Sequence, residues 1–253
     1  MVIVKSAREI ELMKVAGKVL AELFQYMEGK IVPGVSTYDI DQEVEKFILS
    51  HGCTPAEKGY YGYPASSCVS VNETLLHGIP SQKIILKEGD IVSLDVVTTY
   101  KGYNADACRT YMVGTVTNRA KRLVDVTKNA FFEGVALIKP GVKLGDVSAC
   151  IQKYVESHGY SVTRDYTGHG IGKDMHEDPS IPNYGKPGTG ITLQKGMTLA
   201  IEPMVLEGKA NTRVLGDGWT VKSRDGGLTA HYENTVVVTD DGYEIITMLE
   251  EEK

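Results

Sequence analysis

Residues 33–52 read PGVSTYDIDQEVEKFILSHG, and residues 140–159 read PGVKLGDVSACIQKYVESHG. Aligned without gaps, the two stretches share eight of twenty residues (Pro, Gly, Val, Asp, Lys, Ser, His and Gly), where unrelated segments would share about one. The same offset of 107 residues aligns KEGDIVSLD (87–95) with QKGMTLAIE (194–202). This repeat predicts one domain over residues 1–253, built as two pseudo-symmetric halves at about 7–113 and 117–238.

Each half is expected to contain two helices followed by strands. Ser6-Ala-Arg-Glu9 has the form of a capping box, and a second helix should run from near Ser36 to a C-terminal cap at Gly52. The matching helices of the second half are expected at roughly 117–138 and 143–158. Segments rich in Val, Thr and Ile predict strands at 91–99, 104–113, 197–204 and 231–238. The expected fold class is α+β, with helices covering one face of a curved, mostly antiparallel sheet.

Composition excludes several classes of protein. The 253 residues are 42% hydrophobic and 24% charged, which is typical of a globular enzyme or binding protein and not of a disordered chain. A formal charge of −6 argues against a dedicated nucleic-acid binder. No apolar run is long enough for a membrane span, and the start lacks the pattern of a signal peptide. Four cysteines without a CxxC pair favour reduced thiols and a cytoplasmic location.

Two aspartates lie in a predicted hairpin, IVSLDVVTTYKGYNADACRTYMVG. If the turn is centred between Tyr100 and Lys101, Asp95 and Asp106 face each other directly across the strands. Like charges in that arrangement are destabilising, so the pair needs either a solvated edge or a cation. The flanking Leu, Val and Ala residues favour one shared, partly dry face.

The repeat adds a third and a fourth carboxylate. Glu202, in LAIEPM, corresponds to Asp95, and Glu233 enters the apolar strand HYENTVVV. Four carboxylates in one cleft would raise each other's pKa values unless cations balance their charge. Two divalent ions would do so, and oxygen ligands with one imidazole suit Mn, Fe, Co or Zn.

The histidines fall into different settings. His169 lies between glycines in Thr-Gly-His-Gly-Ile-Gly, and His176 and His77 each follow an apolar residue beside a turn. A single histidine of this kind is usually a hydrogen-bonded structural group, but three of them together with four strand carboxylates favour a hydrolytic site. His51 and His158 are interpreted as structural residues at helix ends, and His231 has no assigned role.

These motifs resemble those of the type I methionine aminopeptidases, in their short bacterial form. Those enzymes belong to the M24 metallopeptidase family and have the pita-bread fold. The resemblance covers essentially the whole chain and rests on LDV, NADACRT, GHGIG, IEP and YENT, with HGIP, MHEDP and DGWTVKSRD on the substrate side. It implies that Asp95, Asp106 and Glu233 hold one metal ion, and that Asp106, His169, Glu202 and Glu233 hold a second. A bridging hydroxide would then attack the first peptide bond of a Met-Xaa substrate with a small second residue.

The resemblance also implies roles on the substrate side. Glu202 would transfer the proton, His176 would stabilise the oxyanion, and His77 would contact the scissile amide. The methionine pocket would consist of Tyr60, Tyr63, Cys68, Met175 and Trp219, and His77 and His176 would also contact the substrate. Met175 stands where the family usually has an aromatic residue, which leaves the exact shape of the pocket open.

Two alternatives remain at this stage. One is another pita-bread peptidase, such as a prolyl aminopeptidase or a prolidase, although those enzymes normally carry an additional N-terminal domain. The other is a non-catalytic binding protein on the same scaffold. As a methionine aminopeptidase, the protein would be a monomeric, cytoplasmic enzyme that acts on the N-termini of nascent polypeptides, transiently near the ribosome and without direct nucleic-acid or membrane contacts.

Overall fold

The computed structural model describes residues 2–250 and has the expected α+β architecture. Its helices are α1 (Ala7–Met27), α2 (Thr37–Ser50), the short 3-10 helix η1 (Tyr60–Gly62), α3 (Asn118–Val135) and α4 (Leu144–Ser157). The capping box at the start of α1 is present, because Ser6 Oγ accepts from the Glu9 N–H and the Glu9 carboxylate accepts from the Ser6 N–H. α2 ends at the expected place, where Gly52 has a φ of +72°.

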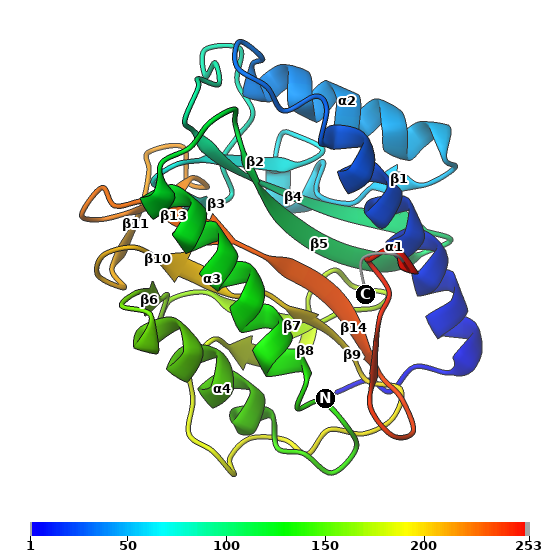
Figure 1. The fold of residues 1–253 in the computed structure, drawn as a ribbon. Coiled ribbons are helices and arrows are strands. Elements are labelled where there is room, and N and C mark those ends of the chain that lie inside the picture. The colour runs from blue at the N-terminus through cyan, green and yellow to red at the C-terminus, as the bar shows by residue number, and fades with distance from the viewer. Residues whose placement is uncertain (1, 251–253) are drawn as a thin grey trace.

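One antiparallel sheet joins the two halves of the chain. Its nine strands lie in the order β1-β4-β5-β14-β9-β7-β8, with β2 beside β4 and β15 beside β14. The bounds are β1 (Thr54–Pro55), β2 (Cys68–Val71), β4 (Ile91–Tyr100), β5 (Tyr103–Met112), β7 (Thr167–Gly170), β8 (Glu177–Pro182), β9 (Thr198–Ile201), β14 (Glu233–Val238) and β15 (Tyr243–Ile245). The central strands β5, β14 and β9 therefore bring segments from both halves of the chain side by side (Figure 1).

Two small sheets extend this arrangement. One has the order β13-β10-β6 and the other β11-β12-β3. Their strands are β3 (Thr74–Leu76), β6 (Ser161–Val162), β10 (Met204–Leu206), β11 (Thr212–Val214), β12 (Val221–Ser223) and β13 (Thr229–His231).

The helices pack on one face of the main sheet and form one hydrophobic core in each half. α1 and α2 cover β4 and β5 through residues such as Leu20, Val44 and Leu94, whereas α3 and α4 cover β9 and β14 through residues such as Phe131 and Ile151 (Figure 1). α4 begins and ends 107 residues after α2, the offset of the sequence repeat. Within residues 2–250, the longest apolar helical stretches fall short of what a membrane crossing needs.

The register of the β4–β5 hairpin differs from the prediction. Tyr100 pairs with Tyr103, so the turn consists of Lys101 and Gly102 alone, both with positive φ (48° and 82°). Such a tight turn matches the twist of the strands it joins. Asp95 consequently lies opposite Cys108 and Asp106 opposite Val97. The two carboxylates share a face, as expected, but as diagonal neighbours and not as a direct pair.

Two predicted strands are each interrupted once. The segment 197–204 divides into β9 and β10 at Glu202-Pro203, and the segment 231–238 divides into β13 and β14 at Tyr232. Proline has no backbone N–H for a sheet ladder, which explains the first break. At the first break the chain passes from the main sheet to a small one, and at the second it passes from a small sheet to the main one. Glu202 lies at the first crossing and Glu233 at the second.

Candidate active site

Five side chains that the sequence singled out come from five adjacent strands. Asp95 lies on β4, Asp106 on β5, and Glu233 is the first residue of β14. Glu202 directly follows β9, and His169 lies within β7. Because these strands are neighbours in the order β4-β5-β14-β9-β7, their side chains meet on one face of the sheet.

The cluster is buried, and several of its polar atoms lack hydrogen-bond partners. Asp106, His169, Glu202 and Glu233 are each less than a tenth exposed, and Asp95 is partly buried. Asp95 Oδ1, Asp106 Oδ1 and Glu233 Oε1 have no partner among the described residues. A buried polar atom without a partner costs about 1–3 kcal/mol, and more for a charged group. These oxygens therefore need a ligand that the polypeptide does not supply.

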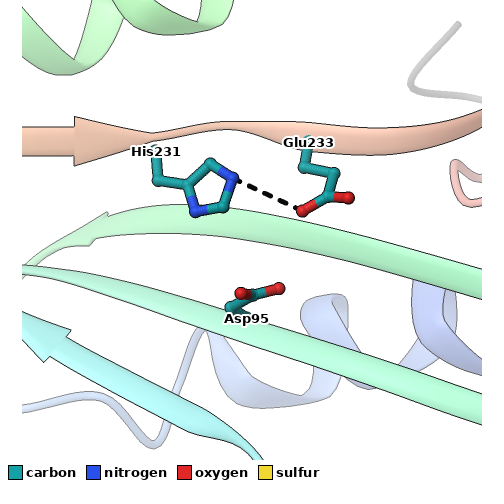
Figure 2. A group of neighbouring side chains, drawn as sticks. All are labelled: Asp95, His231 and Glu233. Carbon is teal, nitrogen blue, oxygen red and sulfur yellow. Dashed lines mark ion pairs between the residues drawn. The ribbon is translucent and has the colours of Figure 1, made fainter. Parts of the chain in front are cut away.

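Distances across the cluster show that its members face one another. His169 Nε2 lies 3.6 Å from Asp106 Oδ2 and 3.6 Å from Glu202 Oε1. Donor atoms of Asp106, His169 and Glu233 lie within 4.8 Å of one another, as do those of Asp95, His231 and Glu233. Figure 2 shows this second group, with His231 and Glu233 on the β13–β14 segment and Asp95 facing them from β4.

Burial, with mutual repulsion in several cases, raises the pKa values of the carboxyl groups. Burial raises the pKa of Asp106 to about 7. Burial, with the added charge of Asp106, raises the pKa values of Asp95, Glu202 and Glu233 well above the usual range. Burial also lowers the pKa of His169 to about 4, so its ring is neutral near pH 7 and is free to bind a cation.

The donor set fits divalent metal ions. Two such ions carry four positive charges, which balance the negative charges of four carboxylates. A bound cation also lowers the pKa of a neighbouring carboxyl group, which is opposite to the effect of neighbouring carboxylates. Carboxylate oxygens with neutral imidazole suit first-row transition metals. The unpartnered buried oxygens lie where these ions would be held.

A cavity of roughly 420 Å³ adjoins the cluster. It is lined by Glu57, Tyr60, Tyr61, Tyr63, Cys68, His77, Asp95, Val97, Asp106, Met175, His176 and Trp219. Every residue predicted for the methionine pocket is in this set, together with the two aspartates. The structure thus brings the predicted pocket and the predicted metal ligands into one site.

Ring contacts fix the shape of the cavity. Trp219 packs edge-on against Tyr63 at 5.1 Å between centroids and against His77 at 6.1 Å. The Tyr60 hydroxyl lies 3.0 Å from His176 Nδ1, and the His176 ring lies 4.3 Å from that of His169. His176 therefore lines the cavity and also contacts His169 of the carboxylate cluster.

The local backbone explains how these side chains are held. Asp41 of α2 accepts from the Ser66 N–H at 2.9 Å and from the Ser67 hydroxyl at 2.8 Å, which anchors the loop before Cys68. His77 has a φ of +54°, an uncommon conformation for a residue with a side chain. The next residue must be glycine, because a Cβ at Gly78 would collide with the Val69 carbonyl oxygen.

The glycines around His169 serve the sheet. A Cβ at Gly168 would collide with the Ala200 carbonyl oxygen, and one at Gly170 with that of Asp178. The absence of side chains at Gly168 and Gly170 therefore lets β7 lie close to β9 and β8, the strands on either side of it.

Two polar residues of the site were missed or left without a role. Glu57 is buried, lines the cavity and has an unpartnered Oε2; burial and the charge of Asp95 raise its pKa well above the usual range. Its sequence context, PAEKG, contains no signal for this. His231 lies beside Glu233, and period-two alternation from Glu233 could have placed it on the same face.

The chain is similar to known metallopeptidases. A model of metallopeptidase family M24 matches residues 11–240. A methionine aminopeptidase of Clostridium acetobutylicum is 50% identical over 99% of this chain and 100% of its own length. The crystal structure of a methionine aminopeptidase from Thermotoga maritima matches with a TM-score of 0.97 and 49% identity, over 98% of this chain and 100% of that one. A prolidase from Pyrococcus furiosus, 23% identical with a TM-score of 0.80 over 98% of this chain and 66% of that one, shares the fold.

The fold and the site define a metal-dependent peptidase, and the chain belongs to metallopeptidase family M24. Within this family it belongs with the methionine aminopeptidases. The predicted family resemblance, the pita-bread fold and the expectation of a hydrolytic enzyme are confirmed.

Proposed function

We propose that this chain uses the carboxylate cluster and the adjoining cavity to remove N-terminal methionine from nascent proteins, with a preference for a small second residue. One observation supports the proposal most strongly. Carboxylate oxygens without hydrogen-bond partners, on β4, β5 and β14, lie beside a cavity lined by aromatic and sulfur-containing side chains. Residues 1–253 would act as a single catalytic domain, because both sequence halves contribute to one site.

The proposed ligand set follows the strands. Asp95, Asp106 and Glu233 would hold one divalent ion, and Asp106, His169, Glu202 and Glu233 the other, with Asp106 and Glu233 shared. When bound, such ions acidify water and polarise a carbonyl oxygen. Co, Mn, Fe and Zn all suit these donors.

His176 is proposed to stabilise negative charge on the scissile carbonyl oxygen. Burial, with the charge of His169, lowers the pKa of His176 to about 4, so the ring is neutral near pH 7. If the Tyr60 hydroxyl donates to Nδ1, the ring proton resides on Nε2 and is available to the substrate. A donor of this kind contributes about 3–4 kcal/mol to the transition state.

His77 and Glu202 complete the proposed machinery. His77 lines the cavity and would contact the scissile amide. Burial lowers its pKa to about 4, so it too is a neutral hydrogen-bonding group. Glu202 lies within 3.6 Å of His169 Nε2 through Oε1 and is proposed to transfer the proton from water to the leaving amine.

The cavity wall is proposed to recognise the methionine side chain. Tyr63 and Trp219 offer aromatic surface, while Cys68 and Met175 offer polarisable sulfur, and both kinds of contact suit a thioether. Met175 is 7% exposed, so it fills the wall where the family usually has an aromatic ring. Because nascent proteins are the proposed substrates, we propose that the enzyme works in the cytoplasm, close to the ribosome. We also propose that it acts as a monomer.

A peptide panel tests this function. Protein loaded with Mn, Co or Fe should cleave Met-Ala and Met-Gly peptides and leave Met-Lys peptides intact. Protein treated with a chelator should cleave none of them, and adding metal back should restore activity. Cleavage of Xaa-Pro peptides in place of Met-Ala peptides would move the enzyme to the prolidase branch of the fold.

A further inference from the structure

His231 is a buried imidazole that no part of the proposed mechanism uses. Its side chain is 2% exposed, yet neither Nδ1 nor Nε2 has a hydrogen-bond partner among the described residues. A buried histidine that merely fills space normally donates or accepts at least one hydrogen bond. The ring instead points into the carboxylate cluster, beside Glu233 and across from Asp95 (Figure 2).

Hydrogen bonds to neighbouring strands hold the backbone at His231. His231 pairs with Met204 at the end of β13. Its N–H donates to Thr110 Oγ1 at 3.0 Å, and its carbonyl oxygen accepts from the same hydroxyl at 2.8 Å. Thr110 belongs to β5, the strand that also carries Asp106. The backbone that carries the imidazole is therefore held at a set position relative to the strand of Asp106.

The distances from this ring match those of a ligand group. Nε2 lies 3.4 Å from Glu233 Oε2 and 3.8 Å from Glu202 Oε2. Donor atoms of Asp95, His231 and Glu233 lie within 4.8 Å of one another. One cation about 2.0–2.2 Å from each donor would need only a small contraction of this group.

The cluster thus contains two groups of the same composition. Asp106, His169 and Glu233 form one, and Asp95, His231 and Glu233 form the other. Each has one aspartate and one imidazole, and Glu233 is common to both. Without His231, the first proposed ion would have only carboxylate oxygens as protein donors, and two unpartnered nitrogens would remain buried beside it.

We propose that His231 is a sixth protein ligand, which coordinates the ion held by Asp95 and Glu233, so that each ion has one imidazole. This inference rests on the proposed function, because it assumes that the cluster holds two ions. A nitrogen donor on the first ion favours Fe, Co or Zn over ions that prefer oxygen alone. The same ring also gives the second oxygen of Glu202 a polar neighbour.

Counting imidazoles tests the inference without measuring activity. The whole chain is loaded with two equivalents of Co(II), and X-ray absorption gives the number of imidazole ligands per ion. Proton NMR of the same sample shows the hyperfine-shifted, exchangeable ring N–H signals. The wild-type protein should show one imidazole per ion and two shifted N–H signals, from His169 and His231.

Three variants identify the source of each signal. His231→Gln and His231→Leu should each lose one imidazole and one shifted signal, while the signal from His169 remains. His158→Gln, a histidine at the end of α4, should leave both signals in place. In calorimetric titration, the His231 variants should bind one of the two ions at least about tenfold more weakly than the wild-type protein. Loss of a residue that only hydrogen-bonds to a metal ligand already has an effect of about this size.

The unpartnered ring also predicts the behaviour of the metal-free protein. No hydrogen bond is lost in metal-free His231→Leu, so it should unfold at a temperature no lower than that of the metal-free wild-type protein. Two bound ions with a single imidazole would overturn the assignment of His231 and leave the proposed function intact. Failure of the wild-type protein to bind any Co(II) would instead overturn the proposed function.

Discussion

Replacing Asp106 with Asn should have opposite effects on the stability of the metal-free protein and on metal binding. Asp106 is 5% exposed, and burial raises its pKa from 3.8 to about 7. A carboxyl group whose pKa is raised on folding destabilises the folded state once the pH is high enough to ionise it. Asn has nearly the same shape and carries no charge, so it removes this destabilisation.

The magnitude follows from that pKa. A rise from 3.8 to about 7 corresponds to roughly 4 kcal/mol when the group is fully ionised in both states. The Asn amide must find hydrogen-bond partners in a buried site, which offsets about 1–3 kcal/mol. We therefore expect metal-free Asp106→Asn to be more stable than metal-free wild type by about 1–3 kcal/mol at pH 8.

The effect should depend on pH in a defined direction. Below pH 3.8 the carboxyl group is protonated in both states, and the variant has no electrostatic advantage. The advantage grows as the pH rises from about 4 to 7 and is then constant. Urea unfolding at pH 5 and pH 8 in the presence of a chelator measures it, with Asp125→Asn on the exposed face of α3 as the control.

Metal should reverse the order of stability. Ions that bind only the folded state stabilise the wild-type protein more strongly the tighter they bind, whereas Asp106→Asn lacks the carboxylate that we propose both ions share. Turnover of Met-Ala peptides should be almost abolished in the variant. Lower stability of metal-free Asp106→Asn at pH 8, or near-normal kcat in the folded variant, would refute the account of a charge-crowded, metal-binding cluster.

Three further predictions address the surroundings of the cluster. Tyr60→Phe should lower kcat for Met-Ala roughly two- to tenfold with little change in KM, because one hydrogen bond to His176 Nδ1 is lost; an unchanged kcat would show that Tyr60 does not orient His176. Trp219→Ala should lower kcat/KM roughly 10- to 100-fold, mainly through KM, since its ring packs on Tyr63 and His77; a loss confined to kcat would contradict a role in binding. Lys5→Met should destabilise the protein by about 3–5 kcal/mol in urea unfolding, because the buried Glu177 loses its ion-pair partner, and adding Glu177→Gln should restore most of that loss.

Much of the fold could be predicted because local signals and the repeat agreed. The capping box at Ser6 and the left-handed Gly52 fixed helix ends within a residue or two. The 107-residue offset of the repeat predicted the position of α4 from that of α2. It also showed that Glu202 corresponds to Asp95. Four of the five proposed ligands stood out in the sequence because acidic residues are unusual in apolar strands, whereas His169 was assigned through the family resemblance.

What could not be predicted depends on tertiary geometry. The predicted turn of the β4–β5 hairpin was displaced by one residue, because the prediction gave no weight to Gly102, which favours a two-residue turn at Lys101-Gly102. Glu57 lies in an irregular segment, where no periodicity relates a side chain to the cavity. His231 had no assigned role because its significance lies in unpartnered nitrogens, which only a folded structure shows.

A crystal of the Co-loaded protein, measured at the cobalt absorption edge, tests the central claim most directly. We predict two anomalous peaks on the face of the sheet where Asp95, Asp106, His169, Glu202 and Glu233 meet. No peak at that place, or peaks only at surface carboxylates, would contradict the metal centre on which the proposed function depends.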